Sequence, residues 1–245
     1  NKIGGLLNNI ESVTEGFSNV KVYIVDNGST DATVPIVNEI KKVHPNINLI
    51  IPSQNKGFGA GNNAVLEMLT SKYHFLVNPD IRISNSEELI KMIDYLEENS
   101  DVGLLSPKIL NTDGSIQKLY KHNPTVLDMA LRFISPQIFP NRQRWFVHEE
   151  TNYKNIGEIE HASGAFMVFR TAIFEKINGF DERYFMYMED ADITRSVRGV
   201  AKAIFYPNAE VVHEWQRDSH KKVRFMWMTV VSMVKYFNKW GWKLW

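Results

Sequence analysis

Short apolar runs and longer amphipathic stretches alternate along the first part of the chain. Runs rich in β-branched residues are typical of buried strands, and apolar residues at helical spacing are typical of helices packed on one face. The pattern predicts helices over residues 1–15, 33–43 and 62–71. It predicts strands over residues 20–25, 48–52 and 75–77. Strands that alternate with helices favour an open, mostly parallel sheet flanked by helices, with the polar loops gathered at one edge.

The second half repeats these signals around a less regular segment. Strands are predicted over residues 102–107, 161–170 and 203–206, and helices over residues 171–177 and 190–199. Prolines interrupt aromatic and basic residues between 121 and 153, which predicts an insertion of loops and short helices over the sheet edge. The fold class is therefore α/β.

A candidate ligand site follows the apolar run that begins at Phe75. The run ends at Asn78-Pro79, because proline lacks the backbone donor that a strand needs, and Asp80 comes next. Open α/β sheets bind ligands where their strands end, and a carboxylate beside an amide can hold a divalent cation against phosphates. The alternative is an Asx-type turn in which Asp80 only satisfies backbone donors.

Two further polar loops follow predicted strands. The first is Asp26-Asn27-Gly28-Ser29-Thr30-Asp31, and the second runs from Gln54 to Asn63 with glycines at 57, 59 and 61. The G-x-G-x-G spacing differs from the dinucleotide-binding fingerprint, which needs G-x-G-x-x-G. The loop is either a tight turn or a set of backbone donors that brings Lys56 close to a phosphate.

Composition narrows the range of functions. Hydrophobic residues make up 44% and charged residues 23% of the 245 residues, as in an ordinary folded domain. The formal net charge is zero, which argues against a nucleic-acid partner. Cysteine is absent, which excludes disulfides and thiolate metal sites. No uncharged run of 18 residues occurs, so no membrane-spanning helix is predicted.

The C-terminal segment, residues 221–245, has a composition of its own. No acidic residue follows Asp218, while lysine, arginine and tryptophan are frequent, and apolar residues recur at helical spacing. One interpretation is a helix that packs its apolar stripe on the domain. The other is a basic amphipathic helix in peripheral contact with an anionic membrane.

The motifs together resemble the inverting nucleotide-sugar glycosyltransferases of family 2, which have the GT-A fold. The resemblance covers about residues 3 to 220, and it implies a GT-A domain over 1–220 followed by the helix of 221–245. Within the domain, 1–110 would bind the nucleotide sugar and 111–220 the acceptor. The resemblance is carried by the segments Val25–Asp31, Asn55–Asn62, Asn78–Asp80, Gly164–Phe166, Gly179–Glu182, Glu189–Asp192 and by His213.

By this resemblance, the nucleotide sugar contacts the loops that follow the first strands. Asp80 and His213 would hold Mn²⁺ or Mg²⁺ against the diphosphate. Asn78 replaces the first aspartate of the family's Asp-x-Asp motif, so we expect weaker metal binding. The residues implied in nucleotide-sugar binding are Asp26, Asn27, Ser29, Asn55, Lys56, Gly57, Asn78 and Asp80.

The resemblance also implies the catalytic groups. Asp190 is expected to be the base that takes the acceptor's proton, with Glu189 as the second choice, while helix capping is the alternative for carboxylates at this helix start. Gly164 and Asp181 are expected at the acceptor, and for Asp181 the capping of a turn is the alternative.

The closest pattern within the family is the bacterial rhamnosyltransferase-type branch. It implies transfer of rhamnose from dTDP-rhamnose to a saccharide or polyprenyl-diphosphate-linked acceptor in cell-wall or surface polysaccharide synthesis. It also implies a cytoplasmic protein, at the inner face of the plasma membrane if the terminal helix binds lipid. The rival functions are a non-catalytic nucleotide-sugar-binding or scaffold protein and a nucleotidyltransferase.

One feature of the family has no counterpart in the sequence. Family members begin with a central strand just before the first helix, and Asn1 occupies the position that follows that strand. We expect a chain without this strand to be less stable and to bind the donor more weakly.

Overall fold

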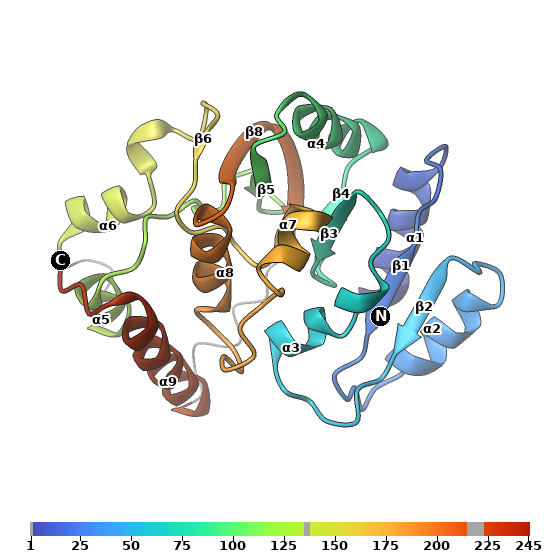
Figure 1. Ribbon diagram of the computed structural model, residues 1–245, viewed down its shortest axis with the longest axis horizontal. Helices are drawn as coiled ribbons and strands as arrows, with labels where there is room; N and C mark the ends of the chain where they lie inside the picture. Colours follow the sequence, from blue (N-terminus) through green and yellow to red (C-terminus); the bar gives the residue numbers. More distant parts are fainter. Residues whose placement is uncertain (1, 135–137, 215–222) are drawn as a thin grey trace.

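The computed structural model describes residues 2–134, 138–214 and 223–245. A central sheet has helices on both faces, and the N-terminal elements lie at the opposite end of the molecule from the C-terminal helix (Figure 1). The predicted α/β class is therefore confirmed.

The larger sheet has six strands. Its strand order is β3-β7-β5-β8-β4, and β6 also pairs with β8. The strands are β3 (Tyr73–Val77), β4 (Ile81–Ile83), β5 (Val102–Leu110), β6 (Gly157–Glu158), β7 (Phe166–Arg170) and β8 (Lys202–His213).

The prediction of a mostly parallel sheet is wrong for these six strands. Only β5 and β8 pair in parallel, while β3 with β7, β5 with β7, β4 with β8 and β6 with β8 are antiparallel. Apolar runs predict that a segment is buried but not the direction in which it pairs. The prediction that β3 is a parallel strand buried on both faces is also wrong, since it pairs antiparallel and four of its five residues are only half-buried.

Alternation along β7 shows how the sheet is buried on both faces. Phe166 and Val168 belong to one apolar cluster and Met167 and Phe169 to another, and all four side chains are 0% exposed. Successive side chains of a strand point to opposite faces, so a strand between two helical layers is apolar throughout. The sequence shows this as an uninterrupted apolar run.

Helices cover the two faces. Residues of α1 (Lys2–Thr14) and α4 (Ser86–Glu98) contribute to the cluster of Phe166 and Val168. Residues of α7 (Thr171–Lys176) and α8 (Glu189–Arg198) contribute to the cluster of Met167 and Phe169. The start of α8 lies on this second face, which fixes the position of its acidic first turn.

The N-terminal unit forms a smaller sheet. β1 (Val22–Val25) and β2 (Ile47–Ile50) pair in parallel, as predicted, and α2 (Thr33–Lys41) packs with α1 in the cluster that contains Val37. A cavity of about 1220 Å³ separates β1 from β3. In the described part of the chain, each of these two strands is paired along one edge only. The expectation that a central strand is missing concerns this position and stays a prediction.

The glycine-rich segment is itself helical. Residues Phe58–Asn63 form α3, followed by the 3₁₀ helix Leu66–Met68, so the predicted helix over 62–71 is wrong. Two other boundaries change: β7 begins at Phe166 rather than 161, and β8 runs unbroken through the predicted strand and on to His213.

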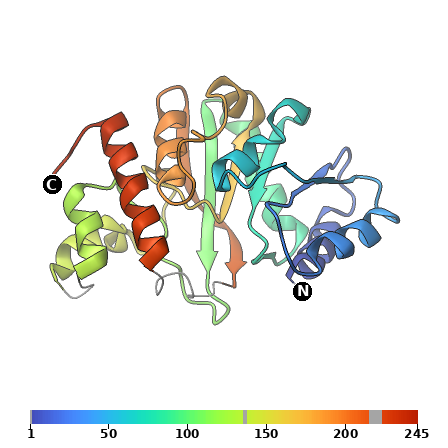
Figure 2. The ribbon, with the colours of Figure 1, turned by 90° about the horizontal axis from the view of Figure 1, so that it is seen from below.

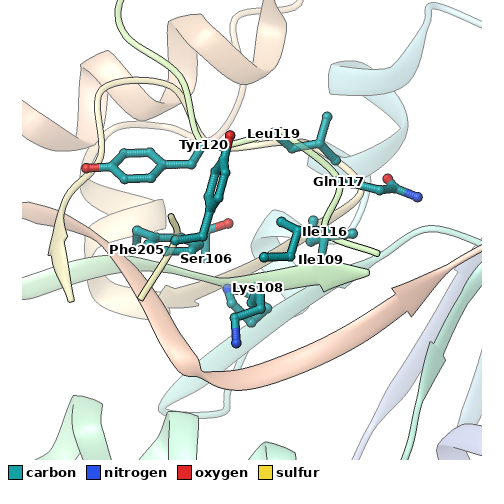
Figure 3. Close-up of a pocket in the computed structure, with 10 residues that line it drawn as sticks. Ser106, Lys108, Ile109, Ile116, Gln117, Leu119, Tyr120 and Phe205 are labelled. Atoms are coloured by element: carbon teal, nitrogen blue, oxygen red, sulfur yellow. The ribbon is translucent and has the colours of Figure 1, made fainter. Parts of the chain in front are cut away.

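The predicted insertion of loops and short helices is confirmed. It contains α5 (Val126–Ile134), α6 (Pro140–Phe146) and a short 3₁₀ helix, Glu149–Thr151. Stacked rings fix it to the sheet: His122 lies between Trp145 and His148, and His148 stacks in turn on Tyr120. Figure 3 shows Tyr120 beside Phe205 of β8, where they border a small internal cavity of about 10 Å³.

The C-terminal segment forms α9 (Val223–Trp240), which lies beside α8 (Figure 2). Tyr236 and Phe237 are 1% exposed and pack with Tyr184 and Met188. Lys221 and Lys222 of the predicted helix lie outside the described residues. No helix in the described ranges has the length and apolar character needed to cross a bilayer.

Candidate active site

Asp80 and His213 are brought together by strand pairing. Asp80 ends the turn before β4, His213 ends β8, and the register of these strands places Ile81 opposite His213. Nε2 of His213 lies 3.2 Å from Oδ1 of Asp80. The side chains are 10% and 21% exposed, so ligands can still reach this partly buried pair.

Gln117 determines which nitrogen of His213 faces the aspartate. The Gln117 amide nitrogen donates to the carbonyl oxygen of His213 at 2.9 Å and to Oδ1 of Asn111 at 2.8 Å. Its amide oxygen therefore faces Nδ1 of His213, 2.9 Å away, and accepts a hydrogen bond from it. In Figure 3 the Gln117 side chain extends away from the small cavity beside Tyr120. A neutral His213 then presents its Nε2 lone pair to Asp80.

This arrangement fits a cation. Oδ1 of Asp80 is buried and can only accept a hydrogen bond, and Nε2 of a neutral His213 can also only accept. The two atoms therefore repel each other unless a proton or a metal ion lies between them. Lys2 places its ammonium 3.6 Å from Oδ2 of Asp80, which shows that the carboxylate already attracts positive charge. Burial raises the pKa of Asp80, but when a proton occupies Nε2 of His213, the hydrogen bond and charge of this imidazolium, followed by the charge of Lys2, hold the pKa of Asp80 below its ordinary value.

The loop after β1 is organised by Asp26. Its Oδ2 accepts hydrogen bonds from the backbone nitrogens of Gly28 at 3.2 Å and Ser29 at 3.0 Å, and the residue is 5% exposed. One carboxylate oxygen of Asp26 is thus occupied by its own loop. Five of the predicted nucleotide-sugar residues line the large cavity: Asp26, Asn27, Ser29, Asn78 and Asp80.

The glycine-rich segment packs against the loop that precedes α8. Gly57 has φ of 100°, and a Cβ there would lie 2.0 Å from the carbonyl oxygen of Phe185. The backbone nitrogen of Phe58 donates to that same oxygen at 3.0 Å, while Oδ1 of Asn55 accepts from the nitrogen of Gly57 at 2.9 Å. Asn55, Lys56 and Gly57 do not line the large cavity, and their nucleotide-binding role stays a prediction.

A second polar cluster lies at the start of α8. Glu189 is 8% exposed, and its Oε2 has no hydrogen-bond partner among the described residues. Burial, followed by the charge of Asp190, raises the pKa of Glu189 to about 8. Asp190 is more accessible, with 25% of its side chain exposed. Met188 occupies the N-cap position, so none of these carboxylates is the N-cap residue itself, and Glu189 makes no side-chain bond that would cap the helix.

Asp190 is held by groups that the sequence analysis missed. Its Oδ1 accepts from the backbone nitrogen of Ala191 at 2.9 Å and lies 3.2 Å from Nε2 of His161. Burial raises the pKa of Asp190, but the charge and hydrogen bond of His161 and the charge of Lys121 hold it well below its usual range. Asp190 is therefore ionised at neutral pH. A Cβ on Gly164 would lie 3.5 Å from Cβ of Asp190, so Gly164 adjoins this group.

Asp181 and Asp192 have structural partners. Oδ1 of Asp181 accepts from the backbone nitrogen of Arg183 at 3.1 Å, which caps a turn, and both its oxygens contact the Arg183 guanidinium. Arg183 and then Lys239 hold the pKa of Asp181 well below its usual range, although burial opposes them. Asp192 accepts from Lys239 and from Trp240 of α9. The turn-capping alternative for Asp181 is confirmed, and its acceptor role stays a prediction.

A third cluster, His122, His148 and Glu150, lies in the insertion. One ligand atom of each lies within 4.8 Å of the others, so this group could converge on a metal ion. The two imidazole rings are stacked, however, with centroids 3.6 Å apart, whereas metal ligands point their nitrogens toward a common centre. Burial, followed by the charge of His122, lowers the pKa of His148 to about 4. The rings therefore pack the insertion against the sheet.

The sheet and its two carboxylate clusters define a protein of the GT-A type, and comparisons with known proteins agree. The family model described as "Glycosyl transferase family 2" matches residues 1–178. The chain belongs to glycosyl transferase family 2.

The relatives found include rhamnosyltransferases. The chain is 27% identical over 208 residues to the N-acetylglucosaminyl-diphospho-decaprenol L-rhamnosyltransferase of Mycobacterium tuberculosis, covering 79% of the chain and 66% of the relative. It is 28% identical over 177 residues to rhamnosyltransferase WbbL of Escherichia coli, covering 66% of the chain and 62% of the relative. The chain thus spans just under two thirds of these relatives' length.

Solved structures share the fold. One is the structure of the mannosyltransferase PcManGT from Pyrobaculum calidifontis in complex with GDP-Man and Mn²⁺. The match covers 97% of this chain and 60% of the PcManGT chain, with a TM-score of 0.67 and 18% identity. Another is the structure of GalNAc-T7 with UDP, GalNAc and Mn²⁺. The match covers 95% of this chain and 45% of the GalNAc-T7 chain, with a TM-score of 0.66 and 10% identity. At these identities the likeness shows the GT-A fold.

Proposed function

We propose that this chain carries the catalytic domain of an inverting glycosyltransferase. It transfers a sugar, rhamnose from dTDP-rhamnose, to a saccharide on polyprenyl diphosphate in cell-wall or surface polysaccharide synthesis. The relatives named as rhamnosyltransferases support this substrate class. The main structural support is the Asp80–His213 pair, in which a glutamine orients the imidazole lone pair toward a buried carboxylate oxygen.

Asp80 and His213 are the residues that would hold a divalent cation. When bound, such a cation neutralises charge on the departing nucleoside diphosphate. The imidazole ligand makes Mn²⁺ a better candidate than Mg²⁺, because Mg²⁺ is held mainly by oxygen atoms. Since the described protein groups supply few ligands, the diphosphate and water would have to supply the others, and we expect the affinity without nucleotide to be weak.

Asp190 acts as the general base on the acceptor side. Inversion requires that the acceptor hydroxyl lose a proton as it attacks the anomeric carbon, and a positioned base typically contributes about 10²–10⁴-fold. Asp190 is ionised and partly exposed, and both its hydrogen bond from Ala191 and its contact with His161 involve Oδ1. These contacts orient Oδ2 for the acceptor. Glu189 stays protonated at neutral pH, which keeps a second negative charge out of the site.

Asp190→Asn tests this assignment. The amide keeps the size of the side chain but cannot take a proton, so we expect the variant to bind nucleotide normally and to lose transfer by at least about 100-fold. Asp94→Asn, an exposed carboxylate on α4, is the matched control and keeps full activity. Transfer at the wild-type rate by Asp190→Asn rejects the proposed base. Metal-dependent nucleotide binding without donor hydrolysis or transfer in any form of the protein supports the rival, non-catalytic function.

A further inference from the structure

The helix α9 carries apolar residues on two adjoining faces, one buried and one exposed. Its Met233, Tyr236 and Trp240 pack with the cluster of α8 and the segment before it. A second stripe faces solvent: Met226 is 49%, Trp227 69%, Val230 38% and Val234 41% exposed. At about 100° per residue these four positions fall within one arc of about 100°. A helix that is apolar on both faces normally has both of them covered.

Polar contacts fix which face of α9 points outward. Lys239 donates to Oδ2 of Asp192 at 2.8 Å, and Trp240 donates to Oδ1 of the same residue at 2.7 Å. Ser232 donates to the carbonyl oxygen of Met186 at 2.8 Å. Turning the exposed stripe inward would break all three bonds, so these contacts keep the stripe directed away from α8.

The charged residues of the C-terminal segment itself are of one sign. Residues 219–245 contain six lysines and arginines and no acidic residue. Lys235 and Lys239 are directed toward the carbonyl oxygen of Arg183 and the carboxylates of Asp181 and Asp192, so the face predicted from the sequence as basic is partly used inside the protein. The surface offered to a partner is apolar, and the exposed Lys243 follows just beyond its end.

The residues after α9 continue the apolar surface. Trp242, Leu244 and Trp245 are 55%, 62% and 72% exposed. The carbonyl oxygens of Lys243 and Leu244 accept from the backbone nitrogens of Val126 and Leu127 at 2.9 and 3.2 Å, which attaches this tail to the start of α5. Exposed tryptophans therefore occur both in the stripe and in the tail, and amphipathic helices in a membrane interface carry tryptophan on their apolar face.

We propose that the stripe of Met226, Trp227, Val230 and Val234, together with the tail of 242–245, binds the surface of an anionic lipid bilayer. The helix lies in the plane of the interface with the apolar stripe toward the acyl chains and the cations toward the lipid phosphates. A second copy of the chain is the poorer occupant, because twofold pairing of the stripe brings like charges together. This contact does not depend on the proposed transfer reaction. It places the start of α8 close to the membrane that would carry a lipid-linked acceptor.

Vesicle co-sedimentation tests the proposal with the full chain at low salt. We expect binding to vesicles of phosphatidylglycerol and phosphatidylcholine, and little binding to phosphatidylcholine alone. Trp227→Glu with Val230→Glu places charges in the middle of the stripe and should weaken binding at least tenfold, because each exposed apolar side chain contributes to insertion. The matched control is Val43→Glu with Ile51→Glu, where the residues are 72% and 57% exposed at the other end of the molecule.

All three proteins should unfold at similar temperatures, because the substituted residues are exposed. Brominated lipids should quench the tryptophan fluorescence of the wild type and of the control, but not of the stripe variant. Absence of binding to anionic vesicles, or equal binding by the stripe variant, overturns the proposal. A concentration-dependent dimer that dissociates in the stripe variant, with no vesicle binding, assigns the face to a second copy instead.

Discussion

Removing the carboxylate of Asp192 should weaken the attachment of α9 to the domain. Asp192 is 1% exposed and accepts three hydrogen bonds: from Tyr184 at 3.2 Å, from Lys239 at 2.8 Å and from Trp240 at 2.7 Å. In Asp192→Ala the Tyr184 hydroxyl, on a residue that is 0% exposed, and the indole N–H lose their acceptor. A buried donor without a partner costs about 1–3 kcal/mol.

The magnitude follows from these three partners. Lys239 is 26% exposed and keeps Asp181 at 3.0 Å, so the loss of its bond to Asp192 contributes little. The two uncharged donors contribute most, and we expect a loss of about 3 kcal/mol in the free energy of unfolding. For a chain of this length, that corresponds to a fall of roughly 6–12 °C in Tm. Asp192→Asn keeps one oxygen acceptor and should lose less than half as much.

Urea unfolding followed by far-UV circular dichroism measures this loss. Asp94→Ala, an exposed acidic residue of α4, is the control and should change stability by less than about 0.5 kcal/mol. A loss below about 1 kcal/mol in Asp192→Ala would refute the reasoning, because it would mean that the three hydrogen bonds do not hold α9 in place.

Three further substitutions test the site. Glu189 has a pKa of about 8 in the folded protein and an ordinary value of 4.5, so ionisation between these pH values stabilises the unfolded state of the wild type. The stability of Glu189→Gln relative to the wild type should therefore increase from pH 4.5 to pH 8. In urea unfolding we expect the difference to reach a few kcal/mol at about pH 8. Gly57→Ala should lower the free energy of unfolding by more than about 2 kcal/mol, because φ of Gly57 is 100° and the added Cβ would collide with Phe185. The control is Gly114→Ala, which has φ of 81° and open space around it and should cost about 1 kcal/mol. Equal losses in the two variants would contradict the clash. Gln117→Leu should weaken Mn²⁺-dependent nucleotide binding about 10–100-fold in titration calorimetry, because the imidazole of His213 loses the amide that orients it. An unchanged affinity would contradict this role of Gln117.

Local patterns in the sequence predicted many of the helices and strands. The strands after Lys21 and before Asn78, the first helix and the acidic start of α8 were predictable, because the spacing of apolar residues and the residues that end strands indicate burial directly. Asp80 and His213 were identified as a pair only through the family resemblance. Their contact depends on the pairing of β4 with β8, which joins segments more than one hundred residues apart.

The predictions that were wrong or missing concern features that depend on tertiary contacts. An apolar run does not state the direction of its partner, so the antiparallel pairing of β3 was missed. The glycines of the 57–61 segment resemble a phosphate-binding loop, yet Gly57 and Gly59 are required by close packing against Phe185 and Phe180. His161, beside Asp190, gave no signal in the sequence, because a single histidine before a strand has no characteristic pattern.

The account depends most on a metal-assisted donor site at Asp80. The most direct measurement is the thermal stability of the chain and of Asp80→Ala with dTDP, UDP or GDP, each with and without Mn²⁺. Ligand at about 100 times its Kd stabilises the folded state by about 2.7 kcal/mol. We predict a Mn²⁺-dependent increase in Tm of roughly 5–10 °C with dTDP, absent in Asp80→Ala. No Mn²⁺-dependent shift with any of the three nucleotides, or an equal shift in Asp80→Ala, would contradict the account.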